Sequence, residues 1–351
     1  MQTFSKTQKE GSLIVLDGTF TKDEVAPYVV KAKQHLKKQI VIDGFRDGSI
    51  PDSLLEAKVG ARTIQDTAAE LLLQDKLTAI LIEHGVLPLV APHASIHTHD
   101  YGSAHVTIEA TVYPSITLPD YKAIALAINS NKKEVAVTDE EVANALIHFR
   151  RERVRVEALE RGETPESALK SAEETVIETL PPLDEDFIKQ IGFDSAAAFE
   201  ENLKKNLHTS KTDQTRSEHR AAILKEITEK TETDVPLPLV EYEIAKMESG
   251  LAQYLSEAGM TLDGYLNQIQ KTRDDIHKDW MPEASGRAKT QLALIEIAKR
   301  ENITEDAKER DALVESVMER MKDADKNAVE AHYTTLLRNE KVLTFLESLT
   351  S

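Results

Sequence analysis

The residues best suited to chemistry lie together at positions 44–51, which read GFRDGSIP. Glycine accepts positive φ and proline fixes φ near about −65°, so this octapeptide is predicted to form a shaped turn. Arg46 offers a planar fork of donors that suits phosphate or carboxylate, and Phe45 beside it is an apolar ring among polar neighbours. A tight polar loop leaves such a ring at the surface, which predicts a docking tip. The alternative is an ordinary turn between helices, with Phe45 folded beneath it.

The charge around the octapeptide differs from that of the whole chain. The chain has 351 residues and a net charge of −18, whereas positions 31–47 hold five basic and two acidic residues. The basic ones are Lys31, Lys33, Lys37, Lys38 and Arg46. The negative net charge of the chain argues against a general nucleic-acid binder, because phosphate contacts need a basic surface. It does not exclude a small basic surface around the octapeptide. A solvated helix face is the other interpretation of these lysines.

Four histidines fall within thirteen residues: His93, His97, His99 and His105. A period of two puts His97 and His99 on one face of a strand, which could bring two imidazoles to a metal ion. No carboxylate triad follows at ligand spacing and the chain has no cysteine, so the pattern supports zinc only weakly. We expect these side chains to decorate an exposed edge strand, and we expect no metal site.

A run of arginines occupies positions 150–155, which read RRERVR. Such a run could bind an acidic partner. Because it falls on a predicted helix with Glu152 and Glu157 close by, a solvated helix face is the preferred interpretation.

The sequence contains none of the patterns GxGxxG, GxxxxGK[ST], GxSxG or HExxH. With no cysteine there is no thiolate chemistry either, so no catalytic constellation and no cofactor are expected. Residues 1–10 are polar and lack the apolar segment of a signal peptide, and no apolar stretch approaches the roughly 20 residues that span a bilayer. We therefore expect a cytoplasmic protein with no membrane partner.

Residues 1–117 are predicted to form an α+β domain, an antiparallel sheet with long helices. The expected elements are a strand at 12–20, helices at 22–40 and 64–84, and strands at 93–99 and 104–113. Thr21 is the expected N-cap of the first helix, and Gly85 stands where a glycine ends the second.

Residues 118–351 are predicted to be mainly α-helical. The expected helices lie at 139–159, 239–258, 274–300, 306–322 and 328–346, with a short one starting at Pro165. Thr138 and Glu141 fit a capping box, whereas Pro181 and Pro182 break the chain. The apolar stripes are narrow and the opposite faces are charged, which is typical of helices that pack as pairs or arms.

The octapeptide closely resembles the ribosome-docking signature of bacterial trigger factor. Further segments similar to that family follow in its order along nearly the full length. They are residues 112–114 (VYP), 118–121 (LPDY), 180–187 (LPPLDEDF), 191–193 (IGF), 234–241, 292–303 and 341–346 (KVLTFL). Only the octapeptide is specific by itself, and the shared order makes the resemblance strong.

The resemblance implies a ribosome-binding domain at 1–117 and a helical chaperone domain at 118–351. The residues implied in docking, at the exit-tunnel protein and the nearby rRNA, are Gly44, Phe45, Arg46, Asp47, Gly48 and Pro51. The helical domain would hold nascent or unfolded polypeptides without ATP, and family members often dimerise when free. The residues implied in holding are Met247, Leu251, Tyr254, Met260 and Trp280, and for each of them plain packing between helices is the alternative.

Two departures from the family change this expectation. An FKBP-type peptidyl-prolyl isomerase domain usually follows the capped helix, but here only residues 160–179 fill the interval, too few for a five-stranded sheet. We therefore expect a short linker and no enzyme. Asp47 stands where the family commonly has lysine, which weakens attraction for rRNA phosphate. A prolyl isomerase and a non-ribosomal helical scaffold or assembly factor are the alternative functions.

Overall fold

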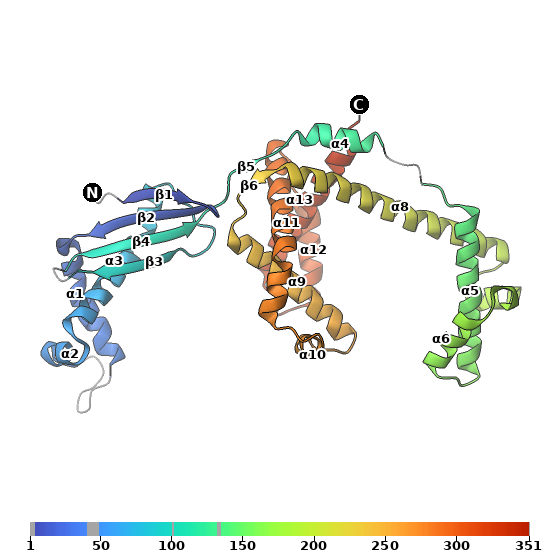
Figure 1. The fold of residues 1–351 in the computed structure, drawn as a ribbon, viewed down its shortest axis with the longest axis horizontal. Helices are drawn as coiled ribbons and strands as arrows, with labels where there is room; N and C mark the ends of the chain where they lie inside the picture. The colour runs from blue at the N-terminus through green and yellow to red at the C-terminus, as the bar shows by residue number, and fades with distance from the viewer. Residues whose placement is uncertain (1–3, 41–48, 100–101, 132–134, 351) are drawn as a thin grey trace. The chain divides into compact units, whose positions relative to one another are not determined.

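The computed structural model of the chain describes residues 4–40, 49–99, 102–131 and 135–350 (Figure 1). The chain forms two compact units and contributes to each of them twice. Unit 1 comprises residues 1–119 and 230–303, and unit 2 comprises residues 120–229 and 304–351.

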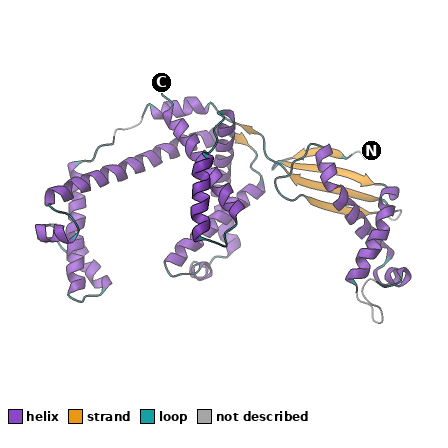
Figure 2. Cartoon of the chain, turned by 180° about the vertical axis from the view of Figure 1, so that it is seen from behind, coloured by secondary structure: helices purple, strands orange, loops and turns teal. Residues whose placement is uncertain are grey.

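Unit 1 begins with a four-stranded antiparallel sheet in the order β1-β2-β4-β3. Its strands are β1 (Ser5–Lys9), β2 (Leu13–Phe20), β3 (His93–Thr98) and β4 (Ala104–Thr111). Every second residue of β4 is buried, as expected when helices cover one face of a sheet (Figure 2). The three predicted strands are confirmed. The fourth strand, β1, was not predicted. It has no apolar residue and is exposed throughout, so its sequence lacks the alternation of apolar and polar residues that indicates a strand.

Three helices complete this part of the core: α1 (Lys22–Gln39), α2 (Asp52–Val59) and α3 (Ala61–Glu83). Thr21 and Glu24 form a capping box at the start of α1, and Gly85 adopts a φ of 60° just beyond α3, so both predicted ends are confirmed. Sheet and helices share one apolar core, in which Leu16, Phe20 and Leu55 are almost fully buried.

A helical arm completes unit 1. Its elements are α9 (Leu237–Glu257), α10 (Leu262–Gln268) and α11 (Arg273–Arg300). A two-stranded ladder of β5 (Ile116–Thr117) and β6 (Glu232–Thr233) leads into it. The Asp234 carboxylate accepts hydrogen bonds from the backbone N–H groups of Gly11 and Ser12, the latter at 3.0 Å. These bonds fasten the first turn of the sheet to the base of the arm.

All described elements of unit 2 are helical. They are α4 (Tyr121–Asn129), α5 (Asp139–Glu160), α6 (Pro165–Glu174), the 3-10 turn η1 (Ile177–Thr179), α7 (Glu185–Gln190), α8 (Ala196–Lys230), α12 (Ala307–Arg320) and α13 (Lys326–Ser348). The predicted helices at 139–159, 306–322 and 328–346 are confirmed within two residues at each end. Among the described helices of the whole chain, none combines the length and apolar character needed to cross a bilayer.

The 35-residue helix α8 was not predicted from the sequence, because its buried residues lie only near its two ends. They are Phe199 and Leu203, then Ile223 and Ile227. The charged middle carries no apolar stripe, so helical periodicity is weak there. The helical majority expected after the N-terminal sheet is nevertheless confirmed.

An ion-pair network joins α8 to α13. Arg220 Nη2 lies 2.7 Å from Glu340 Oε1 and 2.9 Å from Glu347 Oε2, and Arg216 Nη2 lies 2.9 Å from the same Glu347 oxygen. Burial alone would raise the pKa of the Glu347 carboxyl, but hydrogen bonds from Arg216 and Arg220 outweigh it and lower that pKa to about 2.

Candidate functional site

Two helices frame the octapeptide, because α1 ends at Gln39 and α2 begins at Asp52. Lys37 Nζ lies 2.6 Å from Asp52 Oδ1, and Lys33 Nζ lies 2.6 Å from Glu56 Oε1. Ile50, the residue before the exposed Pro51, is only 2% exposed in the core. Ion pairs and an apolar anchor thus fix the point at which the chain returns from the octapeptide. We call this arrangement the loop base.

The lysines of the loop base already have acidic partners. Hydrogen bonds from Lys37 and then Lys33 lower the pKa of Asp52, and the hydrogen bond to Glu56 raises the pKa of Lys33. Lys31 is similarly placed 3.2 Å from Asp75 on α3. The sequence count over 31–47 therefore overstates the positive footprint, because the neutralising carboxylates lie outside that window.

The residues predicted at the tip lie mostly outside the described part of the chain. These are Gly44, Phe45, Arg46, Asp47 and Gly48. Pro51 is described: it is exposed, has a φ of −60° and serves as the N-cap residue of α2. Their role in docking stays a prediction.

The predicted holding residues divide into two groups on the arm. Met247, Leu251 and Trp280 are half-buried, and Trp280 packs against both apolar clusters that hold α9, α10 and α11 together. Tyr254 is 69% exposed and Met260 is 38% exposed. The first group helps to build the arm, whereas the second faces water.

The buried face of α9 differs from the predicted one near the C-terminal end of the helix. The spacing placed Tyr254 on the buried stripe, but Leu255 is buried instead and packs with Leu262 of α10. A helical turn takes 3.6 residues, so a buried stripe can continue from Leu251 by a step of three or of four residues. The sequence prediction assumed a step of three, to Tyr254, whereas the structure continues by four, to Leu255. The sequence also missed other exposed apolar residues of the arm, which lie off the stripe. They are Leu237, Tyr242, Ile269 and Met281.

The histidines occupy the edge of the sheet. His93 and His97 are exposed on the edge strand β3, as expected, and His97 lies opposite His105 of β4. His105 Nε2 is 3.3 Å from Asp17 Oδ2. Among the described residues, no group of three potential ligands is arranged to hold a metal ion.

The arginine run of α5 was predicted to be a solvated face with Glu152 and Glu157 close by. Arg155 does pair with Glu152 and Arg153 with Glu157, but three of the four arginines also bind backbone carbonyls outside the helix, which was not expected. Arg150 donates to the backbone carbonyls of Leu180 and Pro181, the latter at 3.0 Å. Arg151 Nη1 donates to the carbonyl of Ala172 at 2.5 Å, and Arg153 Nη1 to that of Pro182 at 2.6 Å. The partners lie 21 to 31 residues further along the chain, so no pattern within the helix predicts them.

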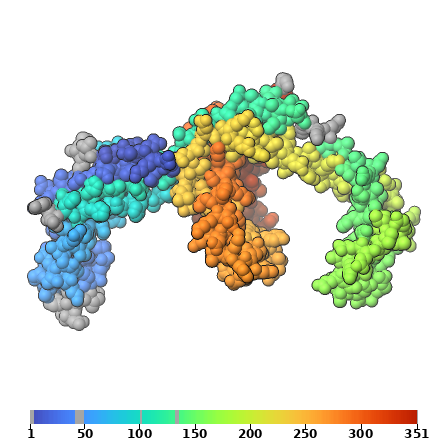
Figure 3. Space-filling view, in the orientation of Figure 1, coloured from blue at the N-terminus to red at the C-terminus, as the bar shows by residue number. Residues whose placement is uncertain are grey.

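These arginines fasten the segment that takes the place of an isomerase domain. Residues 161–195, which we call the junction, contain α6, η1 and α7 and no strand, and all of them are described. The space-filling view shows the junction and α5 as one continuous green body (Figure 3). The expected linker at 160–179 is therefore largely helical.

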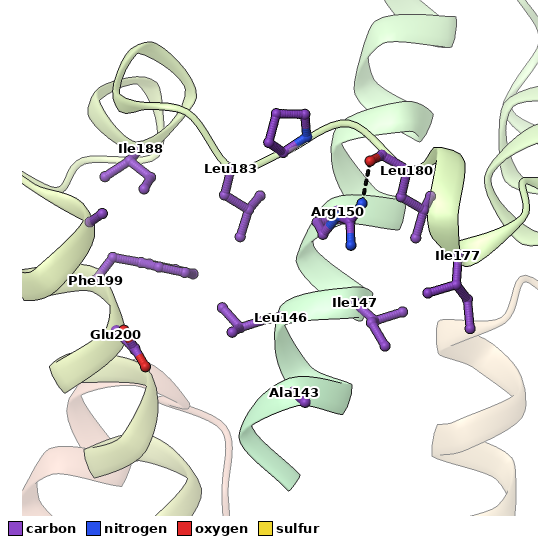
Figure 4. A pocket seen from close by; sticks show the side chains of 12 residues that line it. Ala143, Leu146, Ile147, Arg150, Ile177, Leu180, Leu183, Ile188, Phe199 and Glu200 are labelled. Atoms are coloured by element: carbon purple, nitrogen blue, oxygen red, sulfur yellow. Dashed lines mark hydrogen bonds between the residues drawn. The ribbon is translucent and has the colours of Figure 1, made fainter. Parts of the chain in front are cut away.

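An open groove lies between α5, the junction and the start of α8. Its volume is about 660 Å³, and most of its lining is apolar. Leu146, Leu183 and Phe199 point toward its centre from three different segments (Figure 4). Its buried floor includes Leu180 and Ile188, and Ile177 is 46% exposed at its mouth. We call this cavity the junction groove.

Comparison with known proteins places this geometry in a family. The model of the bacterial trigger factor protein matches residues 1–149, and the model of the trigger factor C-terminus matches residues 195–346. Both models belong to one family and follow its order. Residues 150–194, which contain most of the junction, lie between the two matches.

Individual proteins similar to this chain are trigger factors as well. The trigger factor of Agathobacter rectalis is 26% identical over 365 aligned positions, covering 84% of this chain and 82% of the relative. That of Macrococcus caseolyticus is 23% identical over 370 positions, covering 84% and 86%. Both alignments are longer than this chain, so the relatives carry residues that it lacks.

A solved structure supports the fold. It comes from work titled "Promiscuous Substrate Recognition in Folding and Assembly Activities of the Trigger Factor Chaperone" and has a TM-score of 0.54 at 16% identity. It covers 98% of this chain and 99% of its own. The chain therefore belongs to the bacterial trigger factor family of chaperones, as a member in which the short helices of the junction stand where an isomerase domain would be inserted.

Proposed function

We propose that this protein docks at the ribosomal exit tunnel through the octapeptide and holds nascent or unfolded polypeptides without ATP. Its site of action would be the cytoplasm. The family membership supports the role, and the arm is the observation that carries it. Six apolar side chains of the arm expose between 38% and 69% of their surface although the arm has its own core. They are Leu237, Tyr242, Tyr254, Met260, Ile269 and Met281.

Such side chains suit the holding of unfolded chains. Each one offers a weak apolar contact to a polypeptide that has not yet buried its own apolar residues. Several weak contacts on one surface raise the overall affinity while leaving each contact free to exchange. Holding of this kind shifts the folding equilibrium by mass action and requires no nucleotide.

The loop base supports the docking half of the proposal. Ion pairs fix the start of α2, so the chain has a defined position at one end of the octapeptide. Because Lys33 and Lys37 are already paired, docking rests on the ring and guanidinium of the tip more than on a wide basic surface. The natural target is the exit-tunnel protein, with rRNA contributing less.

A pelleting assay tests the docking. Phe45→Ala/Arg46→Ala is expected to sediment with ribosomes at least about tenfold more weakly than wild type, since loss of a docking hot spot costs more than about 1.4 kcal/mol. The matched control is Leu54→Ala/Arg62→Ala, which also removes an exposed apolar and an exposed arginine side chain. Equal sedimentation of tip variant and wild type, together with a specific folded partner, would favour a non-ribosomal helical scaffold.

Aggregation of a chemically unfolded protein, followed by light scattering without nucleotide, tests the holding. Tyr254→Ser/Met260→Ser is expected to suppress aggregation less well than wild type. Ile82→Ser/Leu87→Ser is the control, because those residues are 73% and 85% exposed outside the arm. If both variants lose activity equally, the arm has no special part in holding.

A further inference from the structure

We propose that the outer edge of strand β3 binds unfolded segments in extended form, which join the four-stranded sheet as an additional antiparallel strand. The inference rests on the proposed holding function and names a class of segment that is held. That class alternates apolar and uncharged polar residues. Recognition goes through the backbone, at a site distinct from the arm.

The register of the sheet shows which backbone groups of β3 point outward. The strand pairs with β4 over all six of its residues, and just beyond it the His99 N–H donates to the Ser103 carbonyl at 2.8 Å. Because antiparallel strands bond through alternate residues, the odd-numbered residues of β3 bond to β4. The N–H and C=O groups of Ala94, Ile96 and Thr98 therefore point away from the sheet.

These outward groups form an open edge. No described strand lies beyond β3, and within the described residues no other backbone segment bonds to it (Figure 1). The six pairs with β4 follow one another in register, so no bulge interrupts the edge. A row of outward donors and acceptors on a regular strand is a template on which another strand can form.

The two edges of the sheet differ in how they are protected. Strand β1, at the opposite edge, carries the exposed residues Lys6 and Lys9. Lysine on an edge strand opposes the approach of a further strand, as proline and bulges do. Strand β3 has the sequence HASIHT, which contains neither lysine nor proline. One edge is therefore protected against strand addition and the other is not.

The side chains of β3 set the pattern of the added segment. Ala94 and Ile96 are half-buried against the core, and the Thr98 hydroxyl donates to the Asp66 carboxylate on α3. His97 is exposed on the other face of the sheet. Directly opposed residues of neighbouring strands share a face, so an added strand places one row beside Ile96 and the other in water. Apolar residues suit the first row and uncharged polar residues the second.

An unfolded segment fits this edge better than a second copy of the chain. Two copies would each bring a net charge of −18 to the interface, whereas a short uncharged segment meets no such repulsion. An unfolded chain also has unpaired backbone groups along its whole length, and bonds to these groups do not depend on one particular sequence.

Two N-methylated isomers of one labelled peptide test the inference by fluorescence anisotropy on the full chain. The parent peptide alternates valine and threonine over about eight residues, near the usual length of a strand. One isomer carries N-methyl groups on its valines, and the other carries the same number on its threonines. The two isomers have equal apolar surface, so only the position of the missing N–H groups distinguishes them.

The register predicts which isomer binds. In an antiparallel pair, the residues that bond to Ala94, Ile96 and Thr98 have their side chains on the helix side of the sheet, where valine is favoured. Methylation of the valines should therefore weaken binding at least about tenfold, and methylation of the threonines less than about threefold. Equal losses in the two isomers, or the reverse order, would overturn the inference.

Amide hydrogen exchange gives a second readout that requires no variant. The parent peptide should slow exchange of the outward Ile96 and Thr98 amides at least about tenfold, because both then gain a backbone partner. The amides of Ser95 and His97 already bond to β4 and should change little. Unchanged exchange at Ile96 and Thr98 with the peptide bound would contradict the inference.

Proline variants then locate the binding. Ala94→Pro removes an outward N–H without removing a bond to β4, and proline is tolerated on an edge strand in this orientation. It should weaken the parent peptide at least about fivefold. The matched control is Gln8→Pro, which removes an outward N–H from β1, and its affinity should stay within about twofold of wild type. An equal loss in the control, or a wild-type dimer that Ala94→Pro dissociates, would contradict the inference.

The same measurements separate this inference from the proposed function. If wild type suppresses aggregation but binds the two isomers equally, the inference fails alone. If wild type neither suppresses aggregation nor binds ribosomes, the proposed function fails. Circular dichroism and thermal unfolding of each variant show whether a loss of binding reflects a loss of structure.

Discussion

The loop base and the junction both gather cations, yet they differ in what the cations bind. At the loop base, Lys33 and Lys37 meet the carboxylates of Asp52 and Glu56. At the junction, Arg150 and Arg151 meet backbone carbonyls instead. Charges cancel in the first region, whereas in the second Arg150 and Arg151 neutralise none of the nearby acids.

This difference shows why a count of charges along the sequence misleads in both directions. The window at 31–47 looks basic, but acids from α2 and α3 neutralise it. The run at 150–155 looks basic too, but its arginines stabilise a segment whose surface is acidic. What matters is the group that each cation meets, and only the fold decides that.

The largest expected effect comes from breaking the junction. Arg150→Met/Arg151→Met leaves four carbonyls without their charged donors, and hydrogen bonds to charged groups contribute about 1.5–3 kcal/mol each. Because the freed carbonyls can bind water instead, we expect a local loss smaller than the sum of the four bonds, about 4 kcal/mol, seen as faster amide hydrogen exchange in residues 165–195.

The matched control for that experiment is Arg155→Met/Arg161→Met. Arg155 pairs with Glu152 on its own helix, and Arg161 with Glu163, at surface sites worth less than about 1 kcal/mol each. If exchange in the junction is the same in both double variants, the carbonyl bonds do not hold it.

The network between α8 and α13 extends the comparison, because there two arginines neutralise a largely buried carboxylate, that of Glu347. The pKa of Glu347 is lower in the folded chain than its usual value of 4.5, so its contribution is complete above that value and is lost as pH falls toward 2. The shift corresponds to at most about 3 kcal/mol.

Denaturant unfolding of wild type and Glu347→Gln at two pH values measures this contribution. At pH 7 the variant should be less stable, and near pH 3 the difference between the two proteins should shrink, because Glu347 of the unfolded wild type then binds a proton while the folded protein still keeps it ionised. A difference that is the same at both pH values would show that the ion pairs with Arg216 and Arg220 are not its source.

The smallest effect is expected at the loop base, where the same kind of pair is exposed. Lys33→Met/Lys37→Met should lower stability the least of the three changes, since the partner carboxylates of Asp52 and Glu56 are about half exposed to water. The pKa of Asp52 should rise back toward its usual value, which NMR titration can follow. Lys9→Met/Lys58→Met is the control, in which that pKa should stay low.

Much of the fold could be predicted because its signals are local. The caps at Thr21 and Thr138 and the glycine at position 85 each act within a few residues, and the structure confirms all three. Strand β1 and helix α8 lack a continuous apolar pattern, so periodicity alone does not reveal them.

The candidate sites were less predictable because they depend on distant partners. The octapeptide was found from its residue types and its resemblance to a family signature. The junction groove has no such signal: Leu146 and Phe199 meet only after the chain passes through α6 and α7. The choice between Tyr254 and Leu255 likewise depended on where α10 packs.

The salt dependence of ribosome binding tests the central claim most directly, because it reports how many phosphate contacts the loop base and tip together make. With the lysines paired, the account predicts about one phosphate contact, so affinity should fall only about threefold to fourfold between roughly 50 and 200 mM monovalent salt. Phe45→Ala/Arg46→Ala should bind at least about tenfold more weakly than wild type at both concentrations. A loss of a hundredfold or more over that range, or full binding by the tip variant, would contradict the account.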